Sequence, residues 1–189
     1  MDLAFNTKVI QHSNQGHYGV YIFENLFTNE YLNILLNKTL ELTEVDSMNR
    51  KTNVHANMTN YQALINDEDF FIFMDKTKSF LKTCIMLRTP HWRNDPAIEF
   101  VDCWGMQFKK GESTAVHTHI GQFWSGVFCI RSEDETKIVF PDLSHAETIK
   151  SNTLYLFPGI MPHFTTEYTA EIPRVALAFN IMINQGEKK

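Results

Sequence analysis

Three histidines in the second half of the chain have types and a spacing that suit a metal site. His117 and His119 stand two positions apart, and side chains with that spacing on a β-strand project from the same face. His163 follows about 45 residues later, which lets a later strand pair back and present a third imidazole to the same point. Three neutral imidazoles suit iron, zinc, copper or nickel. The spacing predicts a metal pocket in a small β-barrel.

The sequence around these histidines strengthens the prediction. A His-x-His pair alone is weak evidence in a chain that contains eight histidines. Here the turn signal Lys109–Gly111 precedes the pair, and the Pro158–Gly159 turn precedes His163. Both histidine segments therefore lie beside turns in a β-rich region, which favours a metal site over surface or core histidines.

A second chemical feature is the strand expected over residues 174–181, which has two unlike faces. Its odd positions carry Val, Leu, Phe and Ile, so one face packs apolar bulk. The even positions are Arg174, Ala176, Ala178 and Asn180. An edge strand with a solvated face is the alternative, but Ala is a poor choice for such a face. We therefore predict that this face lines a ligand pocket in which Arg174 receives an anion.

Composition places the chain among folded proteins of ordinary size. Its 189 residues, 43% apolar and 13% aromatic, predict one domain with a substantial core. The net charge is −5, and the 17 Lys and Arg are scattered rather than clustered. The electrostatic signal of a nucleic-acid binder is therefore missing, although a nucleobase remains open as a substrate.

Targeting signals and cysteine usage predict a soluble cytoplasmic protein. No apolar run reaches 18 residues, and the start of the chain lacks the basic and apolar regions of a signal peptide. Cys84, Cys103 and Cys129 are widely spaced without a Cys-x-x-Cys, which indicates reduced thiols. We expect no membrane contact, and the oligomeric state is open between monomer and homodimer.

The elements that must position these residues form two groups. Residues 1–97 are expected to contain a strand at 18–23, a helix at 29–44 with Thr28 as its N-cap, a polar loop at 46–62 and a helix from about 66 to 88. Residues 98–184 change to short β-rich runs. The strands expected there span 98–108, 113–119, 125–131, 136–140, 147–149, 153–157, 162–166 and 174–183. This order predicts a mostly β fold with N-terminal helices, either a sandwich or a jelly roll.

The motifs together resemble a known family, the 2-oxoglutarate and Fe(II)-dependent oxygenases of the type common in cyanophage and marine bacterial genomes. The resemblance covers about residues 100–182 and rests on order and spacing. The matching motifs are Trp104-Gly105-Met106-Gln107-Phe108-Lys109-Lys110-Gly111, His117-x-His119, Ser125-Gly126-Val127-Phe128, Leu156-Phe157-Pro158, His163 and Arg174-x-Ala176-x-x-Phe179-Asn180.

The resemblance implies a double-stranded β-helix, which is a cupin-like barrel, at residues 98–184. It implies that His117, His119 and His163 bind Fe(II) and that Arg174 binds the distal carboxylate of 2-oxoglutarate. The implied reaction uses O2, decarboxylates 2-oxoglutarate to succinate and hydroxylates an unidentified substrate. If the gene is carried by a phage, the protein acts in the host cytoplasm.

Two positions depart from the family pattern. The second metal position is His119, where relatives usually place Asp or Glu. If His119 binds the metal, the ligand set is neutral; if it does not, the site has two protein ligands, and a water or a substrate group fills the gap. Ala176 stands where many relatives have a Ser that helps the arginine hold the distal carboxylate. Tyr155, Gln107 and Asn180 are the candidates to replace that Ser.

Other functions remain as alternatives. A metal-binding cupin that does not use 2-oxoglutarate would explain Gly111, His117-x-His119 and the Pro158–His163 run, but it gives Arg174 no role. A non-catalytic jelly roll with a structural zinc is a further alternative, although structural zinc sites are usually four-coordinate and often contain Cys. No motif of a hydrolase or a dinucleotide-binding protein occurs.

The sequence does not identify the substrate, and a protein side chain, a nucleobase, a lipid and a small metabolite all stay open. Loops at 46–62 and 90–97 are expected to carry its specificity. His55 and Trp124 are possible substrate contacts, with a structural role as the alternative. The histidines at 12, 17, 91 and 145 are expected at the surface.

Overall fold

The computed structural model describes residues 6–11, 19–45, 52–88 and 97–184. Its helices are α1 (Asn29–Val45) and α2 (Phe71–Arg88), with the short 3₁₀ turns η1 (Glu68–Phe70) and η2 (Pro141–Leu143). Its strands are β1 (Asn6–Gln11), β2 (Gly19–Glu24), β3 (Val54–His55), β4 (Asn57–Met58), β5 (Ala97–Phe108), β6 (Ser113–His117), β7 (Trp124–Arg131), β8 (Lys137–Phe140), β9 (His145–Thr148), β10 (Thr153–Pro158), β11 (His163–Thr165) and β12 (Arg174–Asn184).

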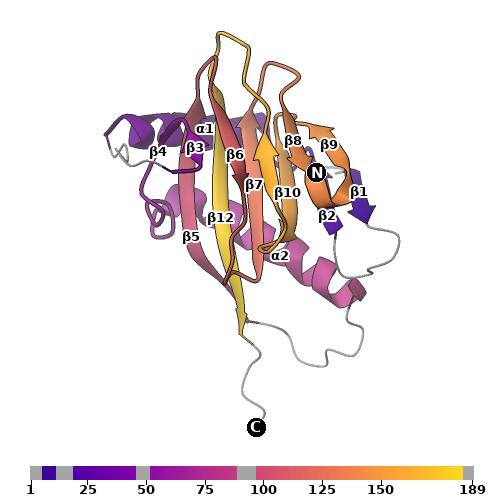
Figure 1. The fold of residues 1–189 in the computed structure, drawn as a ribbon. Helices are drawn as coiled ribbons and strands as arrows, with labels where there is room; N and C mark the ends of the chain where they lie inside the picture. The colour runs from indigo at the N-terminus through magenta and orange to yellow at the C-terminus, as the bar shows by residue number, and fades with distance from the viewer. Residues whose placement is uncertain (1–5, 12–18, 46–51, 89–96, 185–189) are drawn as a thin grey trace.

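The strands form two facing sheets (Figure 1). The larger sheet has seven strands in the order β1-β2-β10-β7-β12-β5-β4, and the smaller has five in the order β3-β6-β11-β8-β9. Every pair of neighbouring strands is antiparallel. From β5 to β12 the chain crosses from one sheet to the other at every step except β8 to β9, so the arrangement is the predicted jelly roll and not a set of βαβ units.

Both helices cover the outer face of the larger sheet (Figure 1). The largest apolar cluster lies between the two helices and the larger sheet. It includes Leu35 of α1, Phe73 of α2 and Phe179 of β12, all fully buried. Two smaller clusters fill the space between the sheets. The helices therefore stiffen the larger sheet from outside, and its inner face is left to build the site.

Strand β12 shows how one sequence serves both faces. Val175, Leu177 and Phe179 belong to the cluster under the helices, whereas Ala176 and Ala178 face the space between the sheets. This division confirms the two-faced strand that the alternation of apolar and small residues predicts.

Side-chain caps fix the starts of the helices near the positions that the sequence predicts. The hydroxyl of Thr28 accepts a hydrogen bond from the backbone N–H of Tyr31 at 3.4 Å, as an N-cap should. The side chain of Asp67 accepts from the N–H of Asp69 at 3.1 Å and caps η1. The expected helices at 29–44 and about 66–88 are confirmed, with α2 itself beginning at Phe71.

Two expectations about strands are corrected. The segment 46–62 is not only a loop, because β3 and β4 lie within it and pair with β6 and β5. Each has two residues, too few to show an alternating pattern. The chain also has the strand β1 ahead of the single early strand expected. These short segments owe their conformation to their partners rather than to local propensity.

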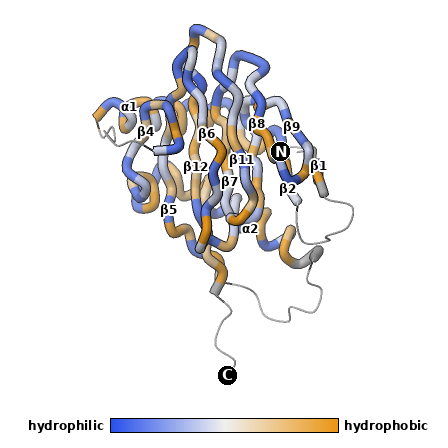
Figure 2. The backbone as a smooth tube through the Cα atoms, in the orientation of Figure 1, coloured by the Kyte–Doolittle hydropathy of each residue, from blue (hydrophilic) through white to orange (hydrophobic). Residues whose placement is uncertain are grey.

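The loops β5–β6, β7–β8 and β11–β12 gather at one end of the sandwich and are mostly hydrophilic (Figure 2). The opposite end holds the loops β6–β7 and β10–β11, which carry the histidine motifs. Among the residues that the structure describes, no helix combines the length and apolar content needed to cross a membrane.

Candidate metal centre

Two strands of the smaller sheet place two of the histidines side by side. His117 ends β6 and His163 begins β11, and the two residues are direct partners in the antiparallel register. Their ring centroids lie 4.3 Å apart. Register therefore brings together residues that are 46 positions apart in the sequence, as the spacing predicts.

His119 lies just beyond the end of β6, so the expected strand at 113–119 is too long by two residues. Its backbone is still fixed, because its N–H donates to the carbonyl of Gly159 at 2.7 Å. Gly159 fits that position because a Cβ there would lie 2.3 Å from the carbonyl oxygen of Gln122 and 2.9 Å from that of His119. The hydrogen bond to Gly159, rather than pairing within a strand, therefore fixes the backbone of His119.

The three imidazoles converge on one point. Their ligand nitrogens all lie within 4.8 Å of one another. The Nδ1 atom of His117 lies 2.8 Å from the carbonyl oxygen of Ala115, and that of His163 lies 3.0 Å from the carbonyl oxygen of Met161. If each Nδ1–H donates to its carbonyl, the Nε2 lone pair is left to face a metal, which is the usual outer-shell arrangement of metal-binding histidines.

Burial keeps these imidazoles neutral. Burial, together with the neighbouring His117, lowers the pKa of His163 to about 3 and that of His119 to about 4. Burial also lowers the pKa of His117, partly offset by its hydrogen bond to Ala115. At pH 7 all three are therefore in the form that binds a metal.

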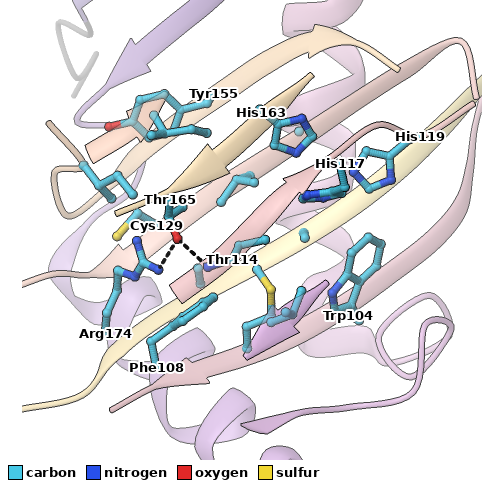
Figure 3. A pocket seen from close by; sticks show the side chains of 18 residues that line it. Trp104, Phe108, Thr114, His117, His119, Cys129, Tyr155, His163, Thr165 and Arg174 are labelled. Carbon is cyan, nitrogen blue, oxygen red and sulfur yellow. Dashed lines mark hydrogen bonds between the residues drawn. The ribbon is translucent and has the colours of Figure 1, made fainter. Parts of the chain in front are cut away.

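The triad opens into a narrow cavity of about 40 Å³ between the two sheets (Figure 3). Its walls are mainly apolar, and the residues supplied by the larger sheet include Trp104, Met106, Phe108, Ala176 and Ala178. Small side chains on β12 leave room where larger ones would fill the space. The histidines lie at one end of this cavity (Figure 3).

Arg174 lies in the same cavity, away from the histidines (Figure 3). Its side chain is 2% exposed, and its guanidinium carbon lies 4.0 Å from the ring centroid of Phe108. Its Nη2 donates only a long hydrogen bond, 3.5 Å, to the hydroxyl of Thr165, and its Nε has no partner among the described residues. Burial lowers its pKa, since desolvation disfavours the cation. A buried cation without an ion pair in the described chain is the signature of an anion site.

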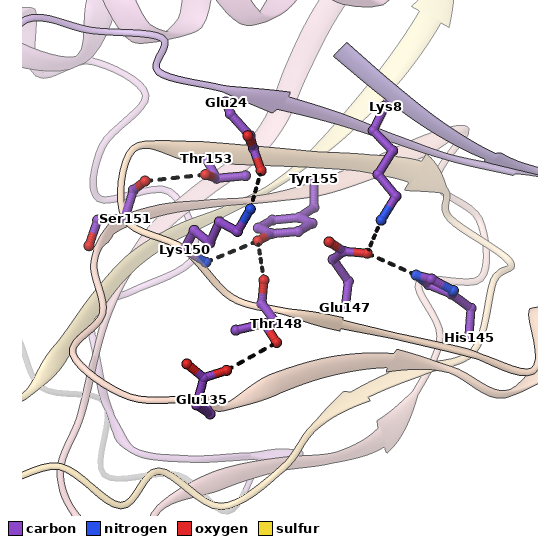
Figure 4. A network of polar contacts seen from close by, with 10 residues as sticks. All are labelled: Lys8, Glu24, Glu135, His145, Glu147, Thr148, Lys150, Ser151, Thr153 and Tyr155. Atoms are coloured by element: carbon purple, nitrogen blue, oxygen red, sulfur yellow. Dashed lines mark hydrogen bonds and ion pairs between the residues drawn. The ribbon is translucent and has the colours of Figure 1, made fainter. Parts of the chain in front are cut away.

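Tyr155, one of the three residues considered as helpers of Arg174, lines the cavity with its ring only. Its hydroxyl accepts from the backbone N–H of Lys150 and donates to the carbonyl of Thr148, each at 3.2 Å (Figure 4). Burial raises its pKa far above the ordinary value. The phenol group is therefore committed to the β9–β10 turn.

Gln107 and Asn180, the other two candidate helpers, do not line the cavity. On β5, Met106 and Phe108 face the cavity, so the alternation turns Gln107 to the opposite face. The amide oxygen of Asn180 accepts from the hydroxyl of Ser125, and its nitrogen donates to Asp102 at 2.9 Å. The structure thus does not bring these two side chains to Arg174.

Sequence reasoning gave no role in the cavity to Thr165 or Trp104, which both line it. Thr165 follows His163 by two positions on β11, so the same alternation argument that paired His117 with His119 could have found it. Trp104 has a buried indole N–H without a partner among the described residues, and its ring centroid lies 6.3 Å from that of His119. Only the folded structure shows whether that N–H has a hydrogen-bond partner.

The surface beside the triad is apolar. Ile120 is 84% exposed, Ile160 is 60% exposed and Phe123 is 54% exposed. They lie on the loops β6–β7 and β10–β11, which are joined by the hydrogen bonds of Gly159 to His119 and Phe123. An uncharged rim therefore borders the histidine end of the cavity.

The remaining expectations have mixed outcomes. Trp124 is buried in the cluster under the helices, where its ring centroid lies 5.8 Å from that of Tyr21, so its role is structural. His55 is exposed on β3. His145 is only partly exposed and lies 3.0 Å from the carboxylate of Glu147, which makes it part of an ion-pair group rather than a free surface residue (Figure 4).

The cysteines at 84, 103 and 129 are buried and free, as expected. The histidines at 12, 17 and 91, and all but the last residue of the loop expected at 90–97, lie outside the described residues.

No protein-family model matches the chain, and no curated protein sequence matches it. Solved structures do. The viral collagen prolyl hydroxylase of Paramecium bursaria Chlorella virus-1, in complex with 2-oxoglutarate, superposes with a TM-score of 0.65 at 13% identity, covering 86% of this chain and 94% of that one. A prolyl-4-hydroxylase of Pseudomonas putida gives a TM-score of 0.64 at 12% identity, covering 87% and 92%.

A third similar structure is the epimerase SnoN from nogalamycin biosynthesis, in complex with Fe3+, alpha-ketoglutarate and nogalamycin RO. Its TM-score is 0.66 at 9% identity, covering 88% of this chain and 79% of that one. The chain therefore has the double-stranded β-helix fold of 2-oxoglutarate and Fe(II)-dependent oxygenases, as predicted, with a partly buried His-x-His…His triad inside it. At these identities the likeness concerns the fold.

Proposed function

We propose that this protein is a 2-oxoglutarate and Fe(II)-dependent dioxygenase that hydroxylates an unidentified substrate and converts 2-oxoglutarate to succinate. The single observation that carries the proposal is the pairing of two features in one cavity. Three neutral imidazoles converge at one end, and the Arg174 cation, which forms no ion pair with the described residues, lies buried away from them. A ligand that binds a metal at one end and carries an anion at the other satisfies both.

The three histidines would bind the metal at one end of the cavity. His117, His119 and His163 hold the metal, which supplies the activation of O2 and the oxidative decarboxylation when it is bound. Three imidazoles carry no charge, so the metal would stay one unit more positive than with the usual carboxylate ligand. That extra charge favours an anionic 2-oxo acid as the next ligand.

The apolar walls around the triad keep water away from the reacting atoms. Met106, Phe108 and Ala178 contribute to this lining. Ile120, Ile160 and Phe123 stand beside the triad outside it. A substrate would therefore meet an uncharged surface as it approaches the metal.

The cupin alternative keeps the barrel and the metal but explains less. It has no use for a 2%-exposed arginine whose Nε is unpaired within the described chain. Burying a cation without a partner destabilises a protein, so its presence is best explained by a bound anion. This argument is the reason for choosing the oxygenase.

Succinate formation tests the proposal. Purified protein supplied with Fe(II), ascorbate and air should convert 2-oxoglutarate slowly to succinate even without its substrate, and His117→Ala should not. Omitting Fe(II) or O2 should stop the conversion. If a protein that holds one Fe(II) leaves 2-oxoglutarate unchanged over many hours, the proposed function is contradicted and the cupin alternative gains support.

A further inference from the structure

The loops beside the histidine triad present an apolar rim, which consists of Ile120, Phe123 and Ile160. Ile120 is 84% exposed, Ile160 is 60% exposed and Phe123 is 54% exposed. Single exposed apolar side chains are ordinary, but a group of them beside a cavity marks a surface that binds a ligand or a partner. The rim is therefore a docking surface for the substrate, which the proposed function leaves unidentified.

Hydrogen bonds of the backbone hold the rim in a fixed shape. The N–H of His119 donates to the carbonyl of Gly159 at 2.7 Å, and the N–H of Gly159 donates to the carbonyl of Phe123 at 3.2 Å. The N–H of Phe123 donates in turn to the carbonyl of Ile181 on β12 at 3.2 Å, which anchors both loops to the larger sheet. An ordered backbone thus presents these apolar side chains to solvent.

The segments that form the rim carry no charged side chain other than histidine. No Asp, Glu, Lys or Arg occurs within residues 113–130 or 151–166, which contain both loops. Tyr61, which is 40% exposed, packs edge-on against Trp104 of the cavity wall, with 5.1 Å between ring centroids. A charged group bound here would lose water without gaining a counter-charge, so the rim selects an uncharged part of a substrate.

The backbone of the two loops favours a hydrocarbon over a polypeptide. The N–H groups of Gln122 and Met161 are engaged by carbonyls of their own loops, at 3.0 and 2.9 Å, in addition to those of His119, Phe123 and Gly159. An extended peptide binds largely through hydrogen bonds to such main-chain groups. Without them, its own N–H and C=O groups would lose their water partners on binding. A hydrocarbon chain has no such groups.

The size of the cavity leaves most of the substrate outside it. The cavity is narrow, about 40 Å³, its walls are mainly apolar, and in the proposed function it also holds the 2-oxo acid. Only a slender part of the substrate can therefore approach the triad, while the remainder lies across the rim. An unbranched hydrocarbon chain is slender and apolar along its whole length, so it suits both surfaces.

We propose that the substrate is a lipid whose hydrocarbon chain lies across the apolar rim and brings one of its C–H bonds to the triad. This inference rests on the proposed function and names the substrate class for it. One atom of O2 enters the chain as a hydroxyl group, the other enters succinate, and the C1 carboxylate of 2-oxoglutarate leaves as CO2. The C–H bond and the 2-oxo acid each supply two of the electrons that reduce O2.

A single lipid, rather than a bilayer, is the partner that the rim fits. Its three side chains offer about as much hydrocarbon as one myristoyl chain, which attaches a protein to a membrane only weakly. Stable attachment needs a second signal such as a basic patch, and residues 113–130 and 151–166 contain no Lys or Arg.

Proton NMR of 1-decanol tests the proposal without turnover. This uncharged alcohol is added below its solubility limit to protein loaded either with paramagnetic Mn(II) or with diamagnetic Zn(II), after free metal has been removed. We expect the chain signals to broaden selectively with the Mn(II) protein, because the chain lies near the metal. The double variant Ile120→Asn/Ile160→Asn should bind 1-decanol at least about 10-fold more weakly, since two apolar contacts are lost.

Ile172→Asn is the matched control. Ile172 is 52% exposed and lies on the β11–β12 loop at the opposite end of the sandwich, so its replacement should leave the affinity for 1-decanol within about 2-fold of wild type. All three substituted side chains are exposed, and their replacement should leave the fold and the affinity for Mn(II) unchanged.

Three results would overturn the assignment. Equal broadening with Mn(II) and Zn(II) would place the chain away from the metal, for example in the apolar groove lined by Phe23 and Phe80. Selective broadening of the uncharged peptide acetyl-Ala-Leu-Ala-amide, without that of 1-decanol, would identify a polypeptide partner. Sedimentation of wild type, but not of the double variant, with phosphatidylcholine vesicles would identify the rim as a membrane contact.

The outcomes also separate this inference from the proposed function. Succinate formation in a protein that shows no selective broadening of 1-decanol would overturn the lipid assignment and leave the oxygenase proposal intact. Selective broadening in a protein that forms no succinate from 2-oxoglutarate would overturn the proposed function, and with it the assignment of the lipid as a substrate.

Discussion

Replacing Arg174 with Met should make the ligand-free protein more stable. The arginine is 2% exposed, its Nε has no partner among the described residues, and its hydrogen bond to Thr165 is 3.5 Å long. A buried polar group left without a partner destabilises a protein by about 1–3 kcal/mol, and a charge by more. Losing the cation–π contact with Phe108 gives back about 0.5–2 kcal/mol. Met fills a similar volume with apolar atoms.

The net expectation for Arg174→Met is a gain of about 1 kcal/mol, which raises Tm by about 2–4 °C in a chain of this size. The matched control is Arg131→Met on the neighbouring strand β7. Arg131 is satisfied, since its Nε and Nη2 both donate to the carbonyl of Pro173, at 3.1 and 3.0 Å. Its replacement should lower Tm, because a paired group is lost and the carbonyl is left without its donor.

Thermal unfolding followed by circular dichroism, with and without ligand, measures both effects. For Ni(II)-loaded wild type, 2-oxoglutarate at 100 times its Kd should add about 2.7 kcal/mol of stability. Arg174→Met should gain almost nothing at the same concentration, whereas Arg131→Met should gain as much as wild type. The reasoning is refuted if Arg174→Met is destabilised like the control and is still stabilised by 2-oxoglutarate.

Three other predictions test the centre and its supports. The pKa of His163 is about 3 and that of His119 about 4 in the folded chain, against an ordinary value of 6.5, so the unfolded chain binds more protons between these values. The metal-free protein should therefore lose stability as pH falls from about 6.5, by up to about 1.4 kcal/mol per pH unit for each histidine. Urea unfolding at pH 7 and 5 should show a smaller loss for His163→Gln than for wild type; an equal loss would refute this cause. Gly159→Ala should weaken Ni(II) binding at least about 10-fold by calorimetry, since its Cβ would lie 2.3 Å from the Gln122 carbonyl oxygen and displace the backbone that holds His119; unchanged affinity would contradict that role. Trp104→Phe removes a buried N–H that has no partner among the described residues, so urea unfolding should show a change below about 1 kcal/mol, against about 3–5 kcal/mol for Trp104→Ala; equal losses would show that the N–H is satisfied.

The parts of the site that the sequence predicts are those governed by short-range periodicity. The alternation of side chains on β12 predicts that Arg174 and Ala176 lie on the cavity face. Because this strand is buried on both sides, its odd positions carry the large apolar residues of one face and its even positions carry the residues of the other. The same alternation extends from His163 to Thr165, so Thr165 was within reach of sequence reasoning. Overall fold class followed from the change to short β-rich runs after residue 97.

The parts that the sequence does not predict depend on contacts between distant segments. The end of β6 at His117 is set by its pairing with β11, and His119 is held instead by Gly159. Whether Tyr155, Gln107 or Asn180 can act together with Arg174 depends on which hydrogen bonds their side chains form in the folded protein. Tyr155 is engaged by Lys150 and Thr148, a match that only the folded β9–β10 turn produces. Residue type alone carries no information about such partners.

The most direct test of the central claim is an anaerobic titration of Fe(II)-loaded protein with 2-oxoglutarate. A 2-oxo acid chelated to Fe(II) gives a weak visible charge-transfer band. We predict that the band appears in wild type and saturates, and that Arg174→Met needs far more 2-oxoglutarate to reach the same intensity because the anion site is lost. A metal-loaded wild type that shows no band at any concentration would contradict the account.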